Sequence, residues 1–346
     1  MHRLSEKRKQ WLARHARRSI QHRLRRRRRT HTAANNSGRA EAIRLTIPET
    51  LTFEDNYAES VAFFDALRSA AEQRNAALTI DFTELRDIGP AAALVLATEL
   101  ECWRMSQLRR IRVVDIDKWD PFIRYLLNTL GLFALVNVAN PPQPLADEHQ
   151  RHFIQFQSHH LADGNHARKL RNELERITGE IPRWQDLYRA LSEAMTNVRQ
   201  HAYPREKGYE RGDRKNRWWM SGAYNASDRM LTCVFYDRGV GIPATVEKTY
   251  GAPAIRELLQ RFRWVESDQA LIAAAMELGR TRTRLPHQGR GLADVEAFIS
   301  RAGTGNLRIL SRRGQYIYSG RRGKAKSLPL ESPLRGTLIE WSIRLR

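Results

Sequence analysis

The chain of 346 residues has little cysteine and no long apolar run. Its two cysteines, Cys102 and Cys233, form neither a disulfide framework nor a metal-binding pattern, which favours a reducing cytoplasm. No stretch approaches the ~18–20 apolar residues of a membrane-spanning helix, and no apolar segment of a secretory signal follows the N-terminus. The sequence therefore predicts a cytoplasmic protein without a membrane span.

The first thirty residues contain almost no acidic side chains and a single aromatic, Trp11. Thirteen lysines and arginines against Glu6 give this segment +12 of the net charge of +21. Such a block repels itself and cannot bury a core, so we expect residues 1–40 to form a disordered arm. Two interpretations stay open. The arm (residues 1–30) binds nucleic acid or another anionic surface through phosphates, or it is a merely solvated tail. The lack of aromatics argues against base stacking.

Strand and helix patterns alternate over residues 41–140, which predicts a small α/β domain. We expect strands at 43–47, 77–82, 111–114 and 133–138, and helices at 57–74, 91–105 and 121–131. A proline-containing linker at 141–150 then leads into a second domain at 151–346.

The second domain should contain a sheet with helices. Strands are expected at 152–157, 217–225, 230–236, 306–311, 315–319 and 338–343, with a helix at 167–177 and a basic loop at 321–326. Trp218 and Trp219 fall on opposite faces of their strand. One should belong to the core, and the other should be either partly exposed or covered by a neighbouring domain.

Glu193, Asn197 and His201 recur every four residues, which places them on one face of a helix. The opposite face is mostly apolar, so the helix can pack on a core. A carboxylate can orient or deprotonate a nucleophile, and an asparagine oxygen suits Mg²⁺. A solvated polar face would show the same spacing, so this motif needs support from elsewhere in the chain.

Two glycine motifs give that support. An apolar strand ends in Asp237 and is followed by Gly239 and Gly241, so a carboxylate precedes backbone that can approach a ligand closely. A second motif precedes an amphipathic helix, whose N-terminus favours an anion. That motif consists of Gly289, Arg290, Gly291 and Leu292.

In this order and spacing, the three motifs and Gly336-Thr337 before the last strand resemble the GHKL ATPase family. This family includes the gyrase-type, Hsp90-type, histidine-kinase and anti-sigma-factor-kinase ATP-binding domains. The resemblance covers about residues 153–346. It implies an α/β sandwich with helices on one face of a mostly antiparallel sheet.

The resemblance also implies an ATP site. Glu193 would polarise the attacking nucleophile, Asn197 would hold Mg²⁺, and Asp237 would accept a hydrogen bond from the adenine amino group. His201 and Tyr203 would be structural flanks. The remaining nucleotide contacts would come from Gly239, Gly241, Gly289, Arg290, Gly291, Leu292 and Thr337.

Residues 243–288 correspond to the ATP lid of the family. We expect two helices there, at 254–262 and 267–278. The basic residues that follow could contact the phosphates through guanidinium groups, or form a solvated loop. They are Arg280, Arg282, Arg284 and Arg290.

The stretch 78–101 resembles the STAS domain, the fold of anti-sigma-factor antagonists, over about residues 41–140. It departs from the family at the regulatory serine, which should follow the strand-end Asp81 by eight to ten residues. Gly89, Pro90 and Ala91 stand there, and none carries a hydroxyl. This departure leaves the domain a docking or scaffolding role toward a protein partner.

Together these features predict a cytoplasmic ATP- and magnesium-binding regulatory protein in signal transduction. Its enzymatic activity would be attack on the γ-phosphate, as an ATPase or a serine or histidine protein kinase. The alternative is a non-catalytic switch, in which ATP closes the lid and changes a binding surface, with the arm touching nucleic acid. The acceptor (water, Ser or His) and the choice between monomer and homodimer stay open.

Overall fold

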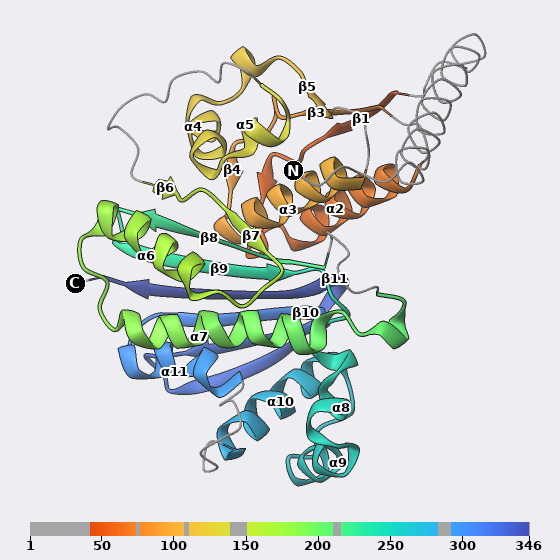
Figure 1. The fold of residues 1–346 in the computed structure, drawn as a ribbon, viewed down its shortest axis with the longest axis vertical. Coiled ribbons are helices and arrows are strands. Elements are labelled where there is room, and N and C mark those ends of the chain that lie inside the picture. Colours follow the sequence, from red (N-terminus) through yellow and green to blue (C-terminus); the bar gives the residue numbers. More distant parts are fainter. Residues whose placement is uncertain are drawn as a thin grey trace, which may run out of the picture.

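The computed structural model describes residues 42–73, 77–106, 111–138, 151–209, 216–282 and 292–345. The predictions for the arm at 1–40, the linker at 141–150 and Gly289, Arg290 and Gly291 lie outside these ranges. Within them, the chain is a mixed α/β protein, and a six-stranded antiparallel sheet is its largest sheet (Figure 1). None of the helices in these ranges combines the length and apolarity needed to cross a membrane.

The N-terminal unit, residues 42–138, is an α/β unit as the alternating pattern predicts, and its main sheet is parallel with strand order β1-β3-β5. Helices α2 and α3 pack beside it. Asp120 caps the N-terminus of helix α4 (Pro121–Leu130) by accepting hydrogen bonds from the N–H groups of Phe122 and Ile123. The elements are β1 Ala42–Thr46, β2 Thr50–Leu51, α2 Tyr57–Glu72, β3 Ala77–Asp81, β4 Asp87–Ile88, α3 Pro90–Ser106, β5 Ile111–Val113, η1 Ile116–Lys118, α4 Pro121–Leu130 and α5 Leu132–Leu135.

The strand expected at 133–138 is wrong, because this segment contains helix α5 instead. Gly131, with φ of 91°, ends α4 and lets the chain turn directly into the next helix. Four apolar side chains then reach the core at helical spacing, and Phe133 stacks on Trp119 with ring centroids 5.8 Å apart. Tertiary packing thus overrides the strand preference of these residues.

The C-terminal unit, residues 151–345, holds the large sheet in the order β10-β11-β9-β8-β6, with β7 also pairing with β8. The expected strand at 152–157 is divided in two, and the two expected strands between 306 and 319 are one strand with an irregular register near Arg312. The basic segment 321–326 is a turn only as far as Gly323. The strands are β6 Arg151–Phe153, β7 Gln157–His159, β8 Trp218–Asn225, β9 Met230–Asp237, β10 Asn306–Ser319 and β11 Lys324–Arg344.

Helical layers cover both faces of this sheet (Figure 1). The unit's own helices α6 Gly164–Thr178, α7 Trp184–Asn197, α10 Asp268–Arg282 and α11 Leu292–Ala302 lie on one face. Helices α2 and α3 of the N-terminal unit cover the other face. Trp218 is buried under the first layer and Trp219 under the second, which confirms that a neighbouring unit covers one of the two tryptophans.

Candidate functional site

Helix α7 buries its apolar side in the core that it shares with α11 and the sheet, and its polar residues lie on the other side, as the spacing predicts. Its α-helical hydrogen bonding ends at Asn197, and the chain continues as a π-helical turn, η2 Val198–Ala202. Single π turns inside helices are frequent at functional sites. The turn changes the helical spacing between Asn197 and His201, yet both residues line one pocket.

The glycine motif after β9 folds back against this π turn. The Gly239 N–H donates to Oδ1 of Asp237 at 2.7 Å, and the Val240 N–H donates to the Ala202 carbonyl at 2.9 Å. A Cβ at Gly239 would lie 2.3 Å from the Ala202 oxygen, so only glycine allows this approach. The motif therefore fixes Asp237 relative to α7.

Strand β11 completes the turn from the other side. Thr337 pairs with Asp237 in the β11–β9 register, and Gly336 adopts φ of 82°. A Cβ at Gly336 would clash with the Asp237 carbonyl oxygen at 1.8 Å. Ser311 of β10 donates to the Gly336 carbonyl and accepts from the Ile242 N–H, each at 3.0 Å. Strands β9 and β11 thus supply Asp237 and Thr337, and Ser311 of β10 holds the backbone around them.

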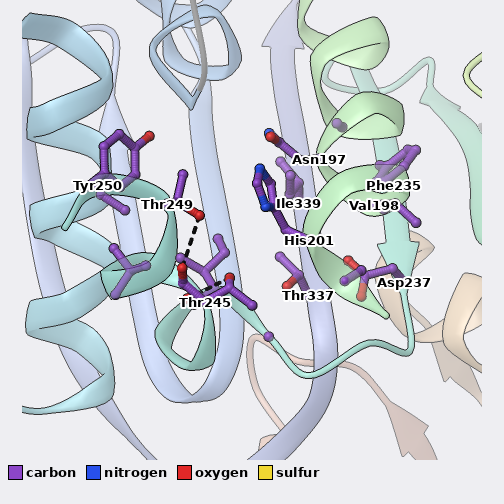
Figure 2. Close-up of a pocket in the computed structure, with 16 residues that line it drawn as sticks. Asn197, Val198, His201, Phe235, Asp237, Thr245, Thr249, Tyr250, Thr337 and Ile339 are labelled. Carbon is purple, nitrogen blue, oxygen red and sulfur yellow. Dashed lines mark hydrogen bonds between the residues drawn. The ribbon is translucent and has the colours of Figure 1, made fainter. Parts of the chain in front are cut away.

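These elements enclose a pocket (Figure 2). Asn197, Asp237 and Thr337 face it from one side, and the short helix α8 Val246–Tyr250 forms the opposite wall. Most of the lining is apolar, including Val198 and Ile339. The structure therefore brings together Asn197, Asp237, Gly241 and Thr337, whose motifs lie far apart in the sequence.

Asp237 is the buried carboxylate of this pocket, with 5% of its surface exposed. Burial raises the pKa of Asp237 to about 7, although hydrogen bonds from Gly239 and Thr337 act in the opposite direction. A carboxylate that pays this desolvation cost is suited to a ligand that donates a hydrogen bond to it.

Glu193 lies one helical turn before Asn197 and does not line the pocket itself. Burial raises the pKa of Glu193, the nearby charge of Asp294 raises it further, and a hydrogen bond with Asn197 lowers it. Asp294 belongs to the first turn of α11, so this turn lies near Glu193. Helix α11, which starts at Leu292, the last residue of the second glycine motif, therefore begins at the Glu193 end of the site.

Tyr203 holds the Asp237 turn from behind. Its hydroxyl donates to the Arg217 carbonyl at 2.6 Å and accepts from the Arg238 N–H at 3.0 Å. These hydrogen bonds give Tyr203 a structural role beside the site, as the resemblance implies. His201 differs, because its side chain reaches the pocket, and burial lowers its pKa.

The segment expected to be a lid is partly core. Helix α9 Ala252–Arg261 and helix α10 match the two predicted helices, but α10 packs on β10 and buries Ile272, Ala274 and Met276 completely. Arg280 at its end pairs with Glu277 and Glu296 at 2.8 and 3.4 Å. The side chains of Arg282, Arg284 and Arg290 lie outside the described residues.

Sequence reasoning missed the wall formed by α8. Thr249 and Tyr250 line the pocket from this helix, and Ile242 and Thr245 do so from the segment before it. Hydrogen bonds from the Thr245 hydroxyl to the Ile242 carbonyl and from the Thr249 hydroxyl to the Thr245 carbonyl order this wall. A five-residue helix is too short to show a periodic pattern, so the sequence carries little signal for it.

Neither the models of protein families nor the curated proteins compared with this chain gave a match.

Proposed function

We propose that residues 151–345 form a GHKL-type domain that binds ATP with Mg²⁺ and acts on its γ-phosphate, as an ATPase or a protein kinase. The N-terminal unit is a STAS-like interaction domain that regulates it. The observation that carries this proposal is Asp237, a buried carboxylate in a largely apolar pocket, beside a helix that presents Asn197.

The pocket chemistry fits adenine. An adenine ring is flat and largely apolar, and its exocyclic amino group needs an acceptor. Val198, Ile242 and Ile339 supply apolar surface, and Asp237 supplies the acceptor. A hydrogen bond from the amino group would favour the ionised form of Asp237 and offset part of the desolvation that raises its pKa.

The Glu193 end of the site fits the phosphates. Asn197 would hold Mg²⁺, which commonly takes few protein ligands and completes its shell with phosphate oxygens and water. The described residues contain no cluster of three or more His, Cys, Asp or Glu arranged for a metal. Mg²⁺ would neutralise charge that develops on the γ-phosphate. Glu193, a half-buried carboxylate whose pKa is raised by burial, would accept the proton of the nucleophile.

The N-terminal unit supports a docking role. Helix α3 begins at Pro90, and Gly89, Pro90 and Ala91 offer no hydroxyl for phosphorylation. The same helix packs on β8 and β9 of the C-terminal unit. A unit that already contacts the sheet of the ATP site is placed to influence that site.

The test follows the γ-phosphate. Full-length protein would receive γ-labelled ATP and Mg²⁺, and free phosphate, labelled protein and bound nucleotide would be measured. We expect Asn197→Ala to lose binding and turnover, and Glu193→Gln to keep binding but lose turnover. Gln200→Ala, an exposed change in the same π turn, is the matched control.

Absence of ATP binding by the unmutated protein would overturn the proposal. Tight binding without turnover, retained in Glu193→Gln, would instead identify the non-catalytic switch.

A further inference from the structure

The face of the large sheet opposite α7 buries a charged cluster between the two units. Glu99 of α3 has only 3% of its side chain exposed. Its Oε1 accepts from Nε of Arg68 at 2.9 Å, and its Oε2 lies 3.2 Å from Nη2 of Arg238. Arg68 belongs to the N-terminal unit and also pairs with Asp65, whereas Arg238 belongs to the C-terminal unit. Glu99 is therefore shared between the units.

Arg238 occupies the turn that positions Asp237. Because successive side chains of an extended strand point to opposite faces, Asp237 faces the pocket while Arg238 faces α3. The backbone of Arg238 is held by Tyr203, and the next residue, Gly239, donates to Asp237. Three consecutive residues thus connect the pocket to the buried cluster.

Burial makes this connection sensitive to Glu99. Arg238 has 13% of its side chain exposed, and its guanidinium would be left without this carboxylate if Glu99 were neutralised. An uncompensated buried charge is costly, so the side chain would move toward water. The tightly packed turn would have to move with it, because Gly239 and Gly336 leave no free space around Asp237.

We propose that Glu99 is a positioning residue for the nucleotide pocket, and that it acts through Arg238 to hold the turn 237–239 in the conformation that directs Asp237 into the pocket. This inference rests on the proposed function for its ligand. It assigns the regulation of the site to the docking of the N-terminal unit. By thermodynamic reciprocity, nucleotide binding then tightens the docking of α3 by the same factor.

The first measurement is the nucleotide dissociation constant of the full-length protein, with a fluorescent ATP analogue and Mg²⁺. Glu99→Gln keeps the shape of the side chain and removes its charge, and we expect about tenfold weaker binding, within the usual range of coupling between sites. Glu101→Gln is the matched control. Glu101 lies on the same helix and in the same interface, where it accepts from Trp219 Nε1 at 2.5 Å and from the Ser158 hydroxyl at 3.1 Å.

A double-mutant cycle separates positioning from general loss of docking. If Glu99 acts through Arg238, the double variant Glu99→Gln with Arg238→Gln binds nucleotide no more weakly than Arg238→Gln alone. Additive losses, equal losses in Glu99→Gln and Glu101→Gln, or no loss within twofold in Glu99→Gln would each overturn the inference. The double variant also removes both charges of the pair, so it stays informative if Glu99→Gln folds poorly.

Hydrogen exchange gives a readout that does not need nucleotide. The N–H groups of Gly239 and Val240 donate to Asp237 and to the Ala202 carbonyl, so they report on the turn directly. We expect faster exchange at these amides in Glu99→Gln than in Glu101→Gln, without ATP. Failure of the unmutated protein to bind ATP would overturn the proposed function alone, whereas unchanged exchange at this turn would overturn the positioning role.

Discussion

The two faces of the large sheet are both buried, but they use buried charge differently. On the face toward the N-terminal unit, some of the buried charged groups join residues of different units, as in Glu99 with Arg238 and Glu54 with Arg308. On the α7 face, the buried carboxylates Asp237 and Glu296 have partners in their own unit.

This difference separates two tasks. Buried ion pairs between units favour one relative orientation of the partners, at a cost in desolvation. A carboxylate that faces a pocket with only hydrogen bonds from its own turn is available to a ligand instead. Strand β9 serves both tasks, because Phe235 and Asp237 face α7 while Val234 and Tyr236 face the N-terminal unit.

The largest combined effect, on stability and on nucleotide binding, is expected where the two faces meet, at Gly239. Gly239→Ala would bring a Cβ within 2.3 Å of the Ala202 carbonyl oxygen, so the turn or the π helix has to move. We expect a loss of about 3 kcal/mol in unfolding free energy, measured by denaturant titration, together with loss of nucleotide binding. Gly208→Ala is the control, because Gly208 has a positive φ but no atom lies within 4 Å of an added Cβ. This variant should lose about 1 kcal/mol in unfolding free energy. Equal losses in the two variants would contradict the close packing of the turn.

The next effect concerns the carboxylate on the pocket side. The folded-state pKa of Asp237 is about 7, well above its ordinary value of 3.8. Between these pH values the native state binds a proton that the unfolded chain has released, so stability falls as pH rises across this window. Asp237→Asn removes this penalty. As pH rises from 4 to 8, we expect the unfolding free energy of this variant to gain about 2–4 kcal/mol relative to that of the unmutated protein.

Thermal or denaturant unfolding of the nucleotide-free protein at several pH values would measure this difference. Asp228→Asn, an exposed change in the turn before β9, is the control. A constant difference between Asp237→Asn and the unmutated protein from pH 4 to pH 8 would show that burial leaves this carboxyl unperturbed.

The contrast also explains which parts of the molecule the sequence could predict. The polar face of α7 and the strand that ends at Asp237 follow from local periodicity, and the structure contains both. The ion-pair partner of Arg238 could not be predicted from the sequence, because Glu99 lies in the other unit and only tertiary packing brings the two residues together. The π turn after Asn197 and the short helix α8 likewise depend on neighbouring elements.

Trp218 and Trp219 offer a matched pair, one on each face, and both are completely buried. Trp218 Nε1 donates to the carbonyl of Leu161, an exposed residue, at 2.9 Å, whereas Trp219 Nε1 donates to the Glu101 carboxylate. Replacement by phenylalanine removes similar apolar area on both faces. Trp219→Phe should cost about 1 kcal/mol more in unfolding free energy, because hydrogen bonds to charged groups contribute more than neutral ones. A larger loss of unfolding free energy for Trp218→Phe would contradict the stronger hydrogen bond assigned to Trp219.

The smallest effect is expected at the Glu193 end of the pocket face, in the pH dependence of turnover. The charge of Asp294 raises the pKa of Glu193 after the larger effect of burial. Asp294→Asn should therefore lower this pKa, so that Glu193 is ionised, and active as a base, at lower pH. The acid limb of the γ-phosphate release profile should move to lower pH, while the stability of the fold changes little. Asp186→Asn is the control, because Asp186 pairs with Arg301 between the same two helices at their other ends. If the acid limb stays in place in Asp294→Asn, a group other than Glu193 controls that limb, and Glu193 has to be reassigned from base to structural residue.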